Sequence, residues 1–321
     1  MKLDRRTALA AGASFVACAA WGQTFPGKPI SLIVPFAPGG NADIVARSIA
    51  VPLSRLVGQT VMVDNRAGGG GAIGTALVAK ALPDGATLLA ATPGQLGTLP
   101  HMFKTPYRLE DFVPIGILAK TSMTIVVRKT DARFRSLEEF LAFAKANPGK
   151  LNVGHAGPGS PNHLAILQFE TMANCRFTPV AYKGSGPALV DLLGGTIDLV
   201  FDQVSSSLPH LKAGSLNALV VLGATRDAAV PATRTLKEVG LPEFDASTYV
   251  GVLVPKGVPA AMVAAYTSAV QQVARDAAFD HGLKEIGSSA YYGDPRRFAE
   301  VLKAEEALAV SLVAQGRLVN E

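Results

Sequence analysis

The 321-residue sequence predicts an α/β protein of two lobes, with two crossing hinge strands and a ligand cleft between the lobes. Three observations lead to this fold class. Apolar runs alternate with amphipathic helical patterns along the chain, which is typical of α/β proteins. Several of these runs lead through a glycine-rich turn into the start of a helix. The apolar run Tyr249–Pro255 follows a second set of strands and helices and leads back to two final helices.

The first strand is expected over Ile30–Phe36, where nearly continuous apolar residues indicate a strand that is covered on both faces. We expect Asn41 to cap the helix that follows, in which apolar residues recur every three or four positions. Pro52 interrupts this pattern, so the helix should kink or end early there. Gly58 provides a suitable stop.

The remaining elements follow from the same patterns. Strands are expected at Thr60–Asp64, Thr87–Thr92, Val113–Leu118, Thr124–Arg128, Leu151–His155, Thr178–Tyr182, Ile197–Phe201, Asn217–Leu222 and Tyr249–Val254. Helices are expected at Ala72–Ala81, Leu137–Ala146, Pro161–Ala173, Pro187–Leu193, Pro259–Ala277 and Pro295–Gln315. Four of these helices begin at a proline, where the missing N–H costs nothing.

This order divides the chain into a leader and two lobes. Residues 1–22 have a basic start and an alanine-rich apolar run that is too short to span a membrane, so we expect a signal peptide cleaved before Gln23. Arg5-Arg6 is similar to a twin-arginine signal, which leaves both the general secretory and the twin-arginine route to the periplasm open. We expect residues 23–122 and 249–321 to form one lobe and residues 123–248 the other.

The stretch Pro35–Asp43 is the first predicted ligand loop. Glycine lets a ligand approach the backbone closely, and the free N–H groups of a helix start favour anions. Asp43 and Arg47 are four residues apart and are interpreted as a structural pair. The expected ligand contacts lie in the turn that leads from the strand to this helix, at Phe36, Pro38, Gly39, Gly40 and Asn41.

A second glycine loop contains Gly69-Gly-Gly-Ala-Ile-Gly74, which matches the G-x-G-x-x-G pattern of dinucleotide sites. Such a site also needs an acidic residue at the end of the next strand. That strand ends in Thr-Pro-Gly, and the nearby Asp84 precedes it. An ordinary turn or a carboxylate-facing loop therefore remains, with Gly68, Gly69, Gly70 and Thr92 as candidate contacts.

Strand ends and helix starts in the second lobe supply the other candidates. Ser160 is expected to cap a helix, with His163 on its first turn. Two further strands end near Tyr182, Gly184 and Asp202, and open α/β sheets bind ligands at such strand ends. An ordinary structural or surface role remains open for each of these side chains.

Other classes of function find little support in the sequence. It contains no G-x-S-x-G, H-E-x-x-H or Walker motif, and its five histidines lack metal-ligand spacing. Cys175 is the one cysteine beyond the leader, so it forms no internal disulfide. The net charge of +5 comes without a basic cluster interleaved with aromatics, which argues against nucleic-acid binding. We therefore expect neither catalysis nor a cofactor or metal.

The ordered motifs resemble the Bug-type substrate-binding proteins of tripartite tricarboxylate transporter systems. The resemblance runs from about Phe25 to the C-terminus, and its main carriers are Pro35-Phe-Ala-Pro-Gly-Gly40, Val63-Asp-Asn-Arg-Ala-Gly-Gly69, Pro83-Asp-Gly85, Gly159-Ser-Pro-Asn-His-Leu164, Tyr182-Lys-Gly184 and Asp191–Asp202. It implies a two-lobed periplasmic binding protein fold of type II. It also implies capture of a dicarboxylate, acidic amino acid or aromatic acid by a monomer that delivers it to a membrane permease.

The chain departs from the family pattern at two places. Thr92-Pro-Gly-Gln-Leu-Gly97 replaces a Gly-Thr-rich loop, and His155 stands where a small residue is common. The ligand therefore cannot be taken over from any relative. Two alternatives stay open, an exported cofactor-dependent enzyme on a similar fold and a ligand sensor for a membrane signalling partner.

Overall fold

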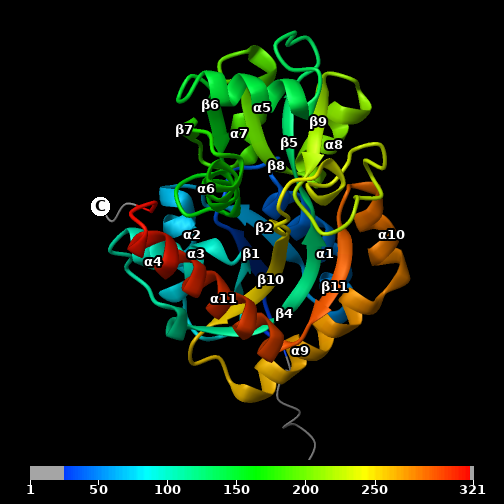
Figure 1. The fold of residues 1–321 in the computed structure, drawn as a ribbon. Coiled ribbons are helices and arrows are strands. Elements are labelled where there is room, and N and C mark those ends of the chain that lie inside the picture. The colour runs from blue at the N-terminus through cyan, green and yellow to red at the C-terminus, as the bar shows by residue number, and fades with distance from the viewer. Residues whose placement is uncertain (1–24, 319–321) are drawn as a thin grey trace, which may run out of the picture.

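A computed structural model describes residues 25–318 of the chain, and the predicted signal peptide at residues 1–22 lies outside them. Figure 1 shows two lobes, each built around its own sheet and covered by helices on both faces. The predicted α/β class and two-lobed architecture are confirmed. Within residues 25–318, no helix is both long and apolar enough to cross a membrane.

The first sheet has six strands in the order β11-β4-β10-β3-β1-β2. Three parallel strands form one half, namely β1 (Ile30–Val34), β2 (Val61–Asn65) and β3 (Thr87–Ala91). Antiparallel strands form the other half, namely β4 (Phe112–Thr121), β10 (Thr248–Pro255) and β11 (Ser289–Gly293). Because side chains alternate along a strand, Leu32 packs into one core and Ile33 into another.

Helices cover both faces of this sheet. The Leu32 face is covered by α1 (Asn41–Val57), α9 (Ala260–Arg275) and α10 (Ala277–Glu285). On the Ile33 face lie α2 (Ala72–Ala79), α3 (Gly94–Gly97) and α11 (Pro295–Ala314), and α4 (Leu99–Met102) packs on α11. Two short 3-10 helices join this lobe, η1 (Gly69–Gly71) and η2 (Leu109–Asp111).

The second sheet has five strands in the order β7-β6-β8-β5-β9. They are β5 (Met123–Arg128), β6 (Asn152–His155), β7 (Thr178–Ala181), β8 (Leu199–Gln203) and β9 (Leu216–Val221). One face is covered by α5 (Leu137–Ala146) and α6 (Pro161–Ala173), the other by α7 (Ser185–Gly194) and α8 (Val204–Lys212). The 3-10 helix η3 (Lys237–Val239) follows β9.

The two lobes are joined where β4 and β10 run side by side. β4 ends at Thr121 and β5 begins at Met123, so a single residue separates the strands of the two sheets. β10 begins at Thr248, which pairs with Thr121. Both crossings therefore lie next to each other, which is the geometry of a hinge between the two sheets.

Several elements differ from the sequence prediction because local patterns were weak. β11 is a half-buried edge strand, and α8 contains a serine run and Pro209, which are poor helix formers. Neither was predicted, nor were the single-turn helices α3 and α4. The helix expected over Pro259–Ala277 is confirmed as α9. The helix after it, α10, was not predicted, and it begins where the Asp276 carboxylate accepts hydrogen bonds from Ala278 and Phe279 N–H.

The prediction for α1 is wrong about the N-cap and about an early end at Pro52, and it is confirmed about the stop at Gly58. Gly40, not Asn41, is its N-cap, and Asn41 is the first helical residue. The helix does not end early at Pro52 but continues to Val57 and stops at Gly58, which has left-handed backbone geometry (φ 68°). Asp43 and Arg47 form the expected ion pair at 2.9 Å, and Asp43 also accepts a hydrogen bond from Gly39 N–H at 3.0 Å.

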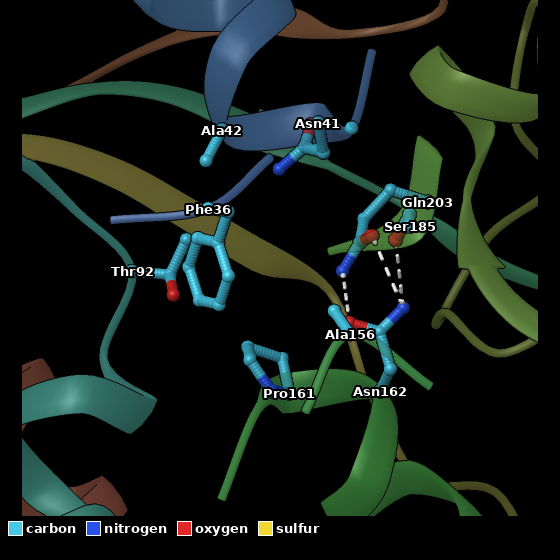
Figure 2. Close-up of a pocket in the computed structure, with 10 residues that line it drawn as sticks. Phe36, Asn41, Ala42, Thr92, Ala156, Pro161, Asn162, Ser185 and Gln203 are labelled. Carbon is cyan, nitrogen blue, oxygen red and sulfur yellow. Dashed lines mark hydrogen bonds between the residues drawn. The ribbon is translucent and has the colours of Figure 1, made fainter. Parts of the chain in front are cut away.

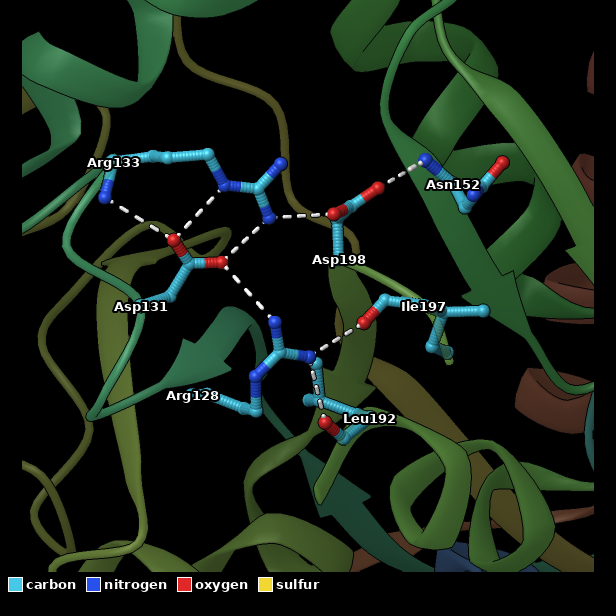
Figure 3. A network of polar contacts seen from close by, with 7 residues as sticks. All are labelled: Arg128, Asp131, Arg133, Asn152, Leu192, Ile197 and Asp198. Atoms are coloured by element: carbon cyan, nitrogen blue, oxygen red, sulfur yellow. Dashed lines mark hydrogen bonds and ion pairs between the residues drawn. The ribbon is translucent and has the colours of Figure 1, made fainter. Parts of the chain in front are cut away.

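A polar network holds one end of the second sheet together (Figure 3). The Arg128 guanidinium donates to the carbonyl oxygens of Leu192 (3.0 Å) and Ile197 (2.8 Å) and to Asp131 (3.3 Å). Arg133 pairs with Asp131 and with Asp198, which accepts from Asn152 N–H. The network thereby ties β5 to β6, α7 and the start of β8.

We predict that Arg128→Met lowers the free energy of unfolding by about 2 kcal/mol, because the carbonyl group of the buried Ile197 loses its donor and that of the buried Leu192 keeps only Gly195 N–H. Urea unfolding measures the change. Arg234→Met is the control, since Arg234 and Glu138 form an exposed ion pair worth at most about 1 kcal/mol. Equal losses in the two variants would contradict the role given to Arg128.

Candidate functional site

A cavity lies between the lobes and is lined by residues of both (Figure 2). The first lobe contributes Phe36, Gly40, Asn41, Ala42 and Thr92, and the second contributes Ala156, Pro161, Asn162, Ser185 and Gln203. Its volume of about 20 Å³ is little more than one water molecule needs. The structure therefore describes the lobes closed on each other, and a larger molecule enters only if they part.

Three helix N-termini meet at this cavity. Asn41 and Ala42 lie in the first turn of α1, Pro161 and Asn162 in that of α6, and Ser185 begins α7. The first turn of a helix has unpaired backbone N–H groups and a partial positive charge. All ten lining side chains are uncharged, so nothing in the lining cancels this potential. The arrangement favours an anion.

Asn41 adds a side-chain donor to this positive end. It is only 4% exposed, and its Oδ1 accepts a hydrogen bond from Ser205 Oγ at 2.8 Å across the lobe contact. Its Nδ2 is buried and has no hydrogen-bond partner within residues 25–318. In Figure 2 this nitrogen points into the space beside the Phe36 ring. A buried amide without a partner is costly, and an acceptor in the cavity would remove that cost.

The amides of the second lobe are already paired. Asn162 Nδ2 donates to the Phe201 carbonyl oxygen at 2.6 Å and to Gln203 Oε1 at 3.3 Å. Gln203 Nε2 donates to Thr248 Oγ1 at 2.9 Å and contacts Asn162 Oδ1 at 3.4 Å. These contacts fix the two side chains and link the cavity to the hinge strand β10.

Of the residues that the sequence singled out, Phe36, Gly40, Asn41 and Thr92 line the cavity. Pro38, Gly39 and Tyr182 lie instead in a wider groove at the outer edge of the lobe contact. The Tyr182 hydroxyl donates to Asp191 at 2.7 Å, which holds it on the surface of α7.

Gly184 lies at the contact between the lobes, where Ala37 N–H donates to the Lys183 carbonyl oxygen at 2.8 Å. The Gly68–Gly70 loop likewise belongs to this contact, because Gly70 packs on the Pro158 carbonyl group. Neither loop lines the cavity in the described conformation.

Asp202 lies beneath the cavity and does not line it. Its side chain is fully buried and accepts hydrogen bonds from Ser206 (2.7 Å) and Ser207 (2.5 Å) at the start of α8. Burial raises the pKa of this carboxyl group, although the serine hydrogen bonds oppose the shift. The charged form is therefore disfavoured next to a site for anions.

Ser160 and His163 also lie behind the cavity wall. Ser160 caps α6 by accepting from His163 N–H at 3.2 Å, and the His163 ring stacks on His155 with 4.6 Å between centroids. Burial lowers the pKa of His155 to about 4, and burial together with the nearby His155 lowers the pKa of His163 to about 3. Both rings are neutral at pH 7.

Six lining residues were not predicted as contacts: Ala42, Ala156, Pro161, Asn162, Ser185 and Gln203. All but Ala156 neighbour predicted positions: Ala42 follows Asn41, and Pro161 and Asn162 lie between Ser160 and His163. Gln203 follows Asp202, and a shift of one residue along a strand moves the side chain to the other face. Ser185 follows Gly184 at the start of α7. The sequence therefore indicated the three helix starts as the place of the site. It did not indicate which residues of each helix start face the cavity.

Comparison with known proteins assigns the chain to a family. The model of the tripartite tricarboxylate transporter family receptor matches residues 45–316. The chain belongs to this family. Its members are solute-binding receptors and not enzymes. The chain is 40% identical to protein BugT of Bordetella pertussis over 239 residues, which are 73% of each protein.

Solved structures agree with this membership. The periplasmic binding protein BugD superposes with a TM-score of 0.87 at 30% identity, over 92% of this chain and 100% of BugD. R. palustris Rpa4515 with adipate has a TM-score of 0.87 at 31% identity, over 92% and 99% of the two chains. MatC of Rhodopseudomonas palustris with bound malate has a TM-score of 0.84 at 31% identity, over 90% and 100%.

The buried histidine pair predicts a loss of stability in acid. The folded state holds both rings neutral, whereas an unfolded histidine has a pKa near 6.5. The stability that depends on the neutral rings is therefore fully present above about pH 6.5. It is lost as the pH falls toward the folded-state pKa values of about 4 for His155 and about 3 for His163. We expect a loss of about 2 kcal/mol for each ring between pH 7 and pH 4.5, measured by urea unfolding. His163→Phe should remove the part of this pH-dependent loss that comes from His163. An unchanged pH dependence in the variant would contradict the prediction.

Gly186 offers a test of the lobe contact. A Cβ at this position of α7 would collide with the Pro38 carbonyl oxygen of the other lobe. Gly186→Ala should therefore disfavour the closed form without unfolding either lobe, and small-angle X-ray scattering should show a larger radius of gyration. Gly194→Ala on the same helix is the control, because nothing lies within 4 Å of that Cβ. Identical scattering from the two variants would count against this contact.

Proposed function

We propose that this protein is an exported receptor that captures a small carboxylate in the cavity between its lobes. One observation supports this most strongly. The unpartnered, buried Nδ2 of Asn41 lies among three helix N-termini in a cavity without charged side chains. A carboxylate would accept from this amide and from the first-turn N–H groups of α1. The malate and adipate bound to two structural relatives are ligands of the same chemical class.

Ligand capture would proceed by hinge closure. The lobes part around the β4 and β10 crossings, the acid binds at the α1 start, and closure brings Asn162 and Ser185 against it. The remaining predicted contacts, from Gly68–Gly70 to Tyr182 and Gly184, would act at the edge of the closing surfaces. His163 and Asp202 would hold the second-lobe wall in place.

The division of the chain and its export are part of this proposal. The lobes would comprise residues 23–122 with 249–321, and residues 123–248. The strand ends at Thr121, Met123 and Thr248 support these boundaries. Residues 1–22 would direct export to the periplasm, by the general secretory or the twin-arginine route, and the periplasmic BugD is a relative in that location.

Delivery of the bound acid to a membrane permease completes the proposal. The family description supports a tripartite tricarboxylate transporter as the partner. The receptor would act as a monomer, because the cavity is completed by two lobes of one chain.

A first screen uses the mature chain from Gln23, refolded free of ligand. The unfolding temperature should rise when one of four classes of acid is added: dicarboxylates, tricarboxylates, amino acids or aromatic acids. A ligand present at about 1,000 times its Kd adds about 4 kcal/mol of stability. A shift with NAD or NADP alone would contradict the proposal.

We predict that Asn41→Asp weakens binding of the acid found in this screen by about 10- to 100-fold, measured by isothermal titration calorimetry. The variant replaces the donor by a negatively charged acceptor, and a hydrogen bond to a charged group contributes about 1.5–3 kcal/mol. An aspartate in the first turn suits the helix, so α1 should still form.

Ser205→Ala is the matched control for this variant. It removes the partner of Asn41 Oδ1 but leaves Nδ2 in place, so affinity should fall much less. Full affinity in Asn41→Asp would show that the carboxylate binds elsewhere.

A further inference from the structure

We propose that the cavity accepts a monocarboxylate with a compact apolar body in preference to a dicarboxylate. This inference rests on the proposed function and concerns the same cavity. It follows from where the free hydrogen-bond donors lie and from what forms the rest of the wall.

The free donors gather at one side. Asn41 Nδ2 has no partner within residues 25–318, and the first-turn N–H groups of α1 lie beside it. Ser185 begins α7 opposite them, with its backbone N 3.4 Å from where a Cβ on Gly40 would lie. These groups converge on one side of the cavity, where one carboxylate would meet them once the lobes part to admit it.

The other polar side chains of the lining are occupied. Both amide nitrogens of the Asn162 and Gln203 pair already donate to neighbours, among them the Phe201 carbonyl oxygen and Thr248 Oγ1. Thr92 Oγ1 donates to Gln95 Oε1 at 2.8 Å, and Thr92 N–H donates to the same oxygen at 3.1 Å. Gln95 Nε2 is also buried and unpartnered within residues 25–318, but Gln95 is not among the lining residues. A second carboxylate in the cavity would therefore have to break one of these side-chain contacts to gain a donor.

The remaining wall is apolar. Phe36, Ala156 and Pro161 face the cavity, and proline has no N–H even though it stands at a helix start. No lysine, arginine or histidine is among the lining residues. A carboxylate moved from water to this wall would lose its hydration without a partner, which is strongly unfavourable. A methyl, methylene or aromatic group would instead bury apolar surface there.

The same argument separates monocarboxylates from amino acids. An ammonium group would need an anionic or acceptor partner, and no carboxylate is among the lining residues. The nearby Asp202 does not line the cavity, and burial raises its pKa; its Oδ2 accepts from two serines, and its Oδ1 has no partner within residues 25–318. The three positive helix ends would also repel a cation.

Calorimetric titration with matched pairs of acids tests the inference on the unmodified mature chain. In each pair the two acids have the same carbon skeleton, and a methyl group of the monoacid is a carboxylate in the diacid: butyrate and succinate, hexanoate and adipate, 4-methylbenzoate and terephthalate. In the pair that fits best, we expect the diacid to bind at least about tenfold more weakly than the monoacid. Asn41→Asp serves as the site control, since it should weaken the monoacid of that pair.

Each outcome has a distinct meaning. Equal or tighter binding of the diacid overturns the inference and leaves the proposed carboxylate receptor intact. Binding of a monoacid that Asn41→Asp does not weaken overturns the inference too, because the acid then lies elsewhere. Failure of both members of every pair, while another acid raises the unfolding temperature in the screen, overturns the inference alone. Failure of every acid in both experiments contradicts the proposed function as well.

Discussion

The direction in which three helices point is the constraint on which the site depends. α1 comes from one lobe and α6 and α7 from the other, yet all three begin at the same cavity. Each helix N-terminus has a partial positive charge, and in a closed cavity with little water this potential is weakly screened. The chain thus gathers three positive helix ends around a cavity that has no cationic side chain in its lining.

Close approach of the two backbones makes this convergence possible. Ala37 N–H reaches the Lys183 carbonyl oxygen, and Gly186 packs on Pro38, with no side chain between the lobes at these points. Gly70 and Gly157 meet in the same way on the other side of the cleft. The glycines that first suggested ligand loops therefore also allow the lobes to touch, and the hinge at Thr121 and Thr248 lets them part.

The sequence predicted the architecture well because periodicity and helix starts are local signals. α5 and α6 were predicted with the bounds that they have, and each begins at a capping serine with a hydrogen-bonded side chain. The site was predicted only in part. Asn41 was expected to cap α1. Its side chain is instead oriented by a hydrogen bond from Ser205, which lies far along the chain on α8. Contacts between lobes of this kind leave no local pattern, and neither does the rotation that turns Gln203 instead of Asp202 toward the cavity.

The central claim is that the Asn41 amide and the start of α1 receive the carboxylate. Nuclear magnetic resonance of the ¹⁵N-labelled chain tests it most directly, by titrating the acid that binds and following the Asn41 side-chain amide and the backbone amides of Asn41 and Ala42. The account predicts saturable downfield shifts of these resonances, since charge-assisted hydrogen bonds form at those protons. Saturable shifts confined to other parts of the chain, with these amides unchanged, would contradict it.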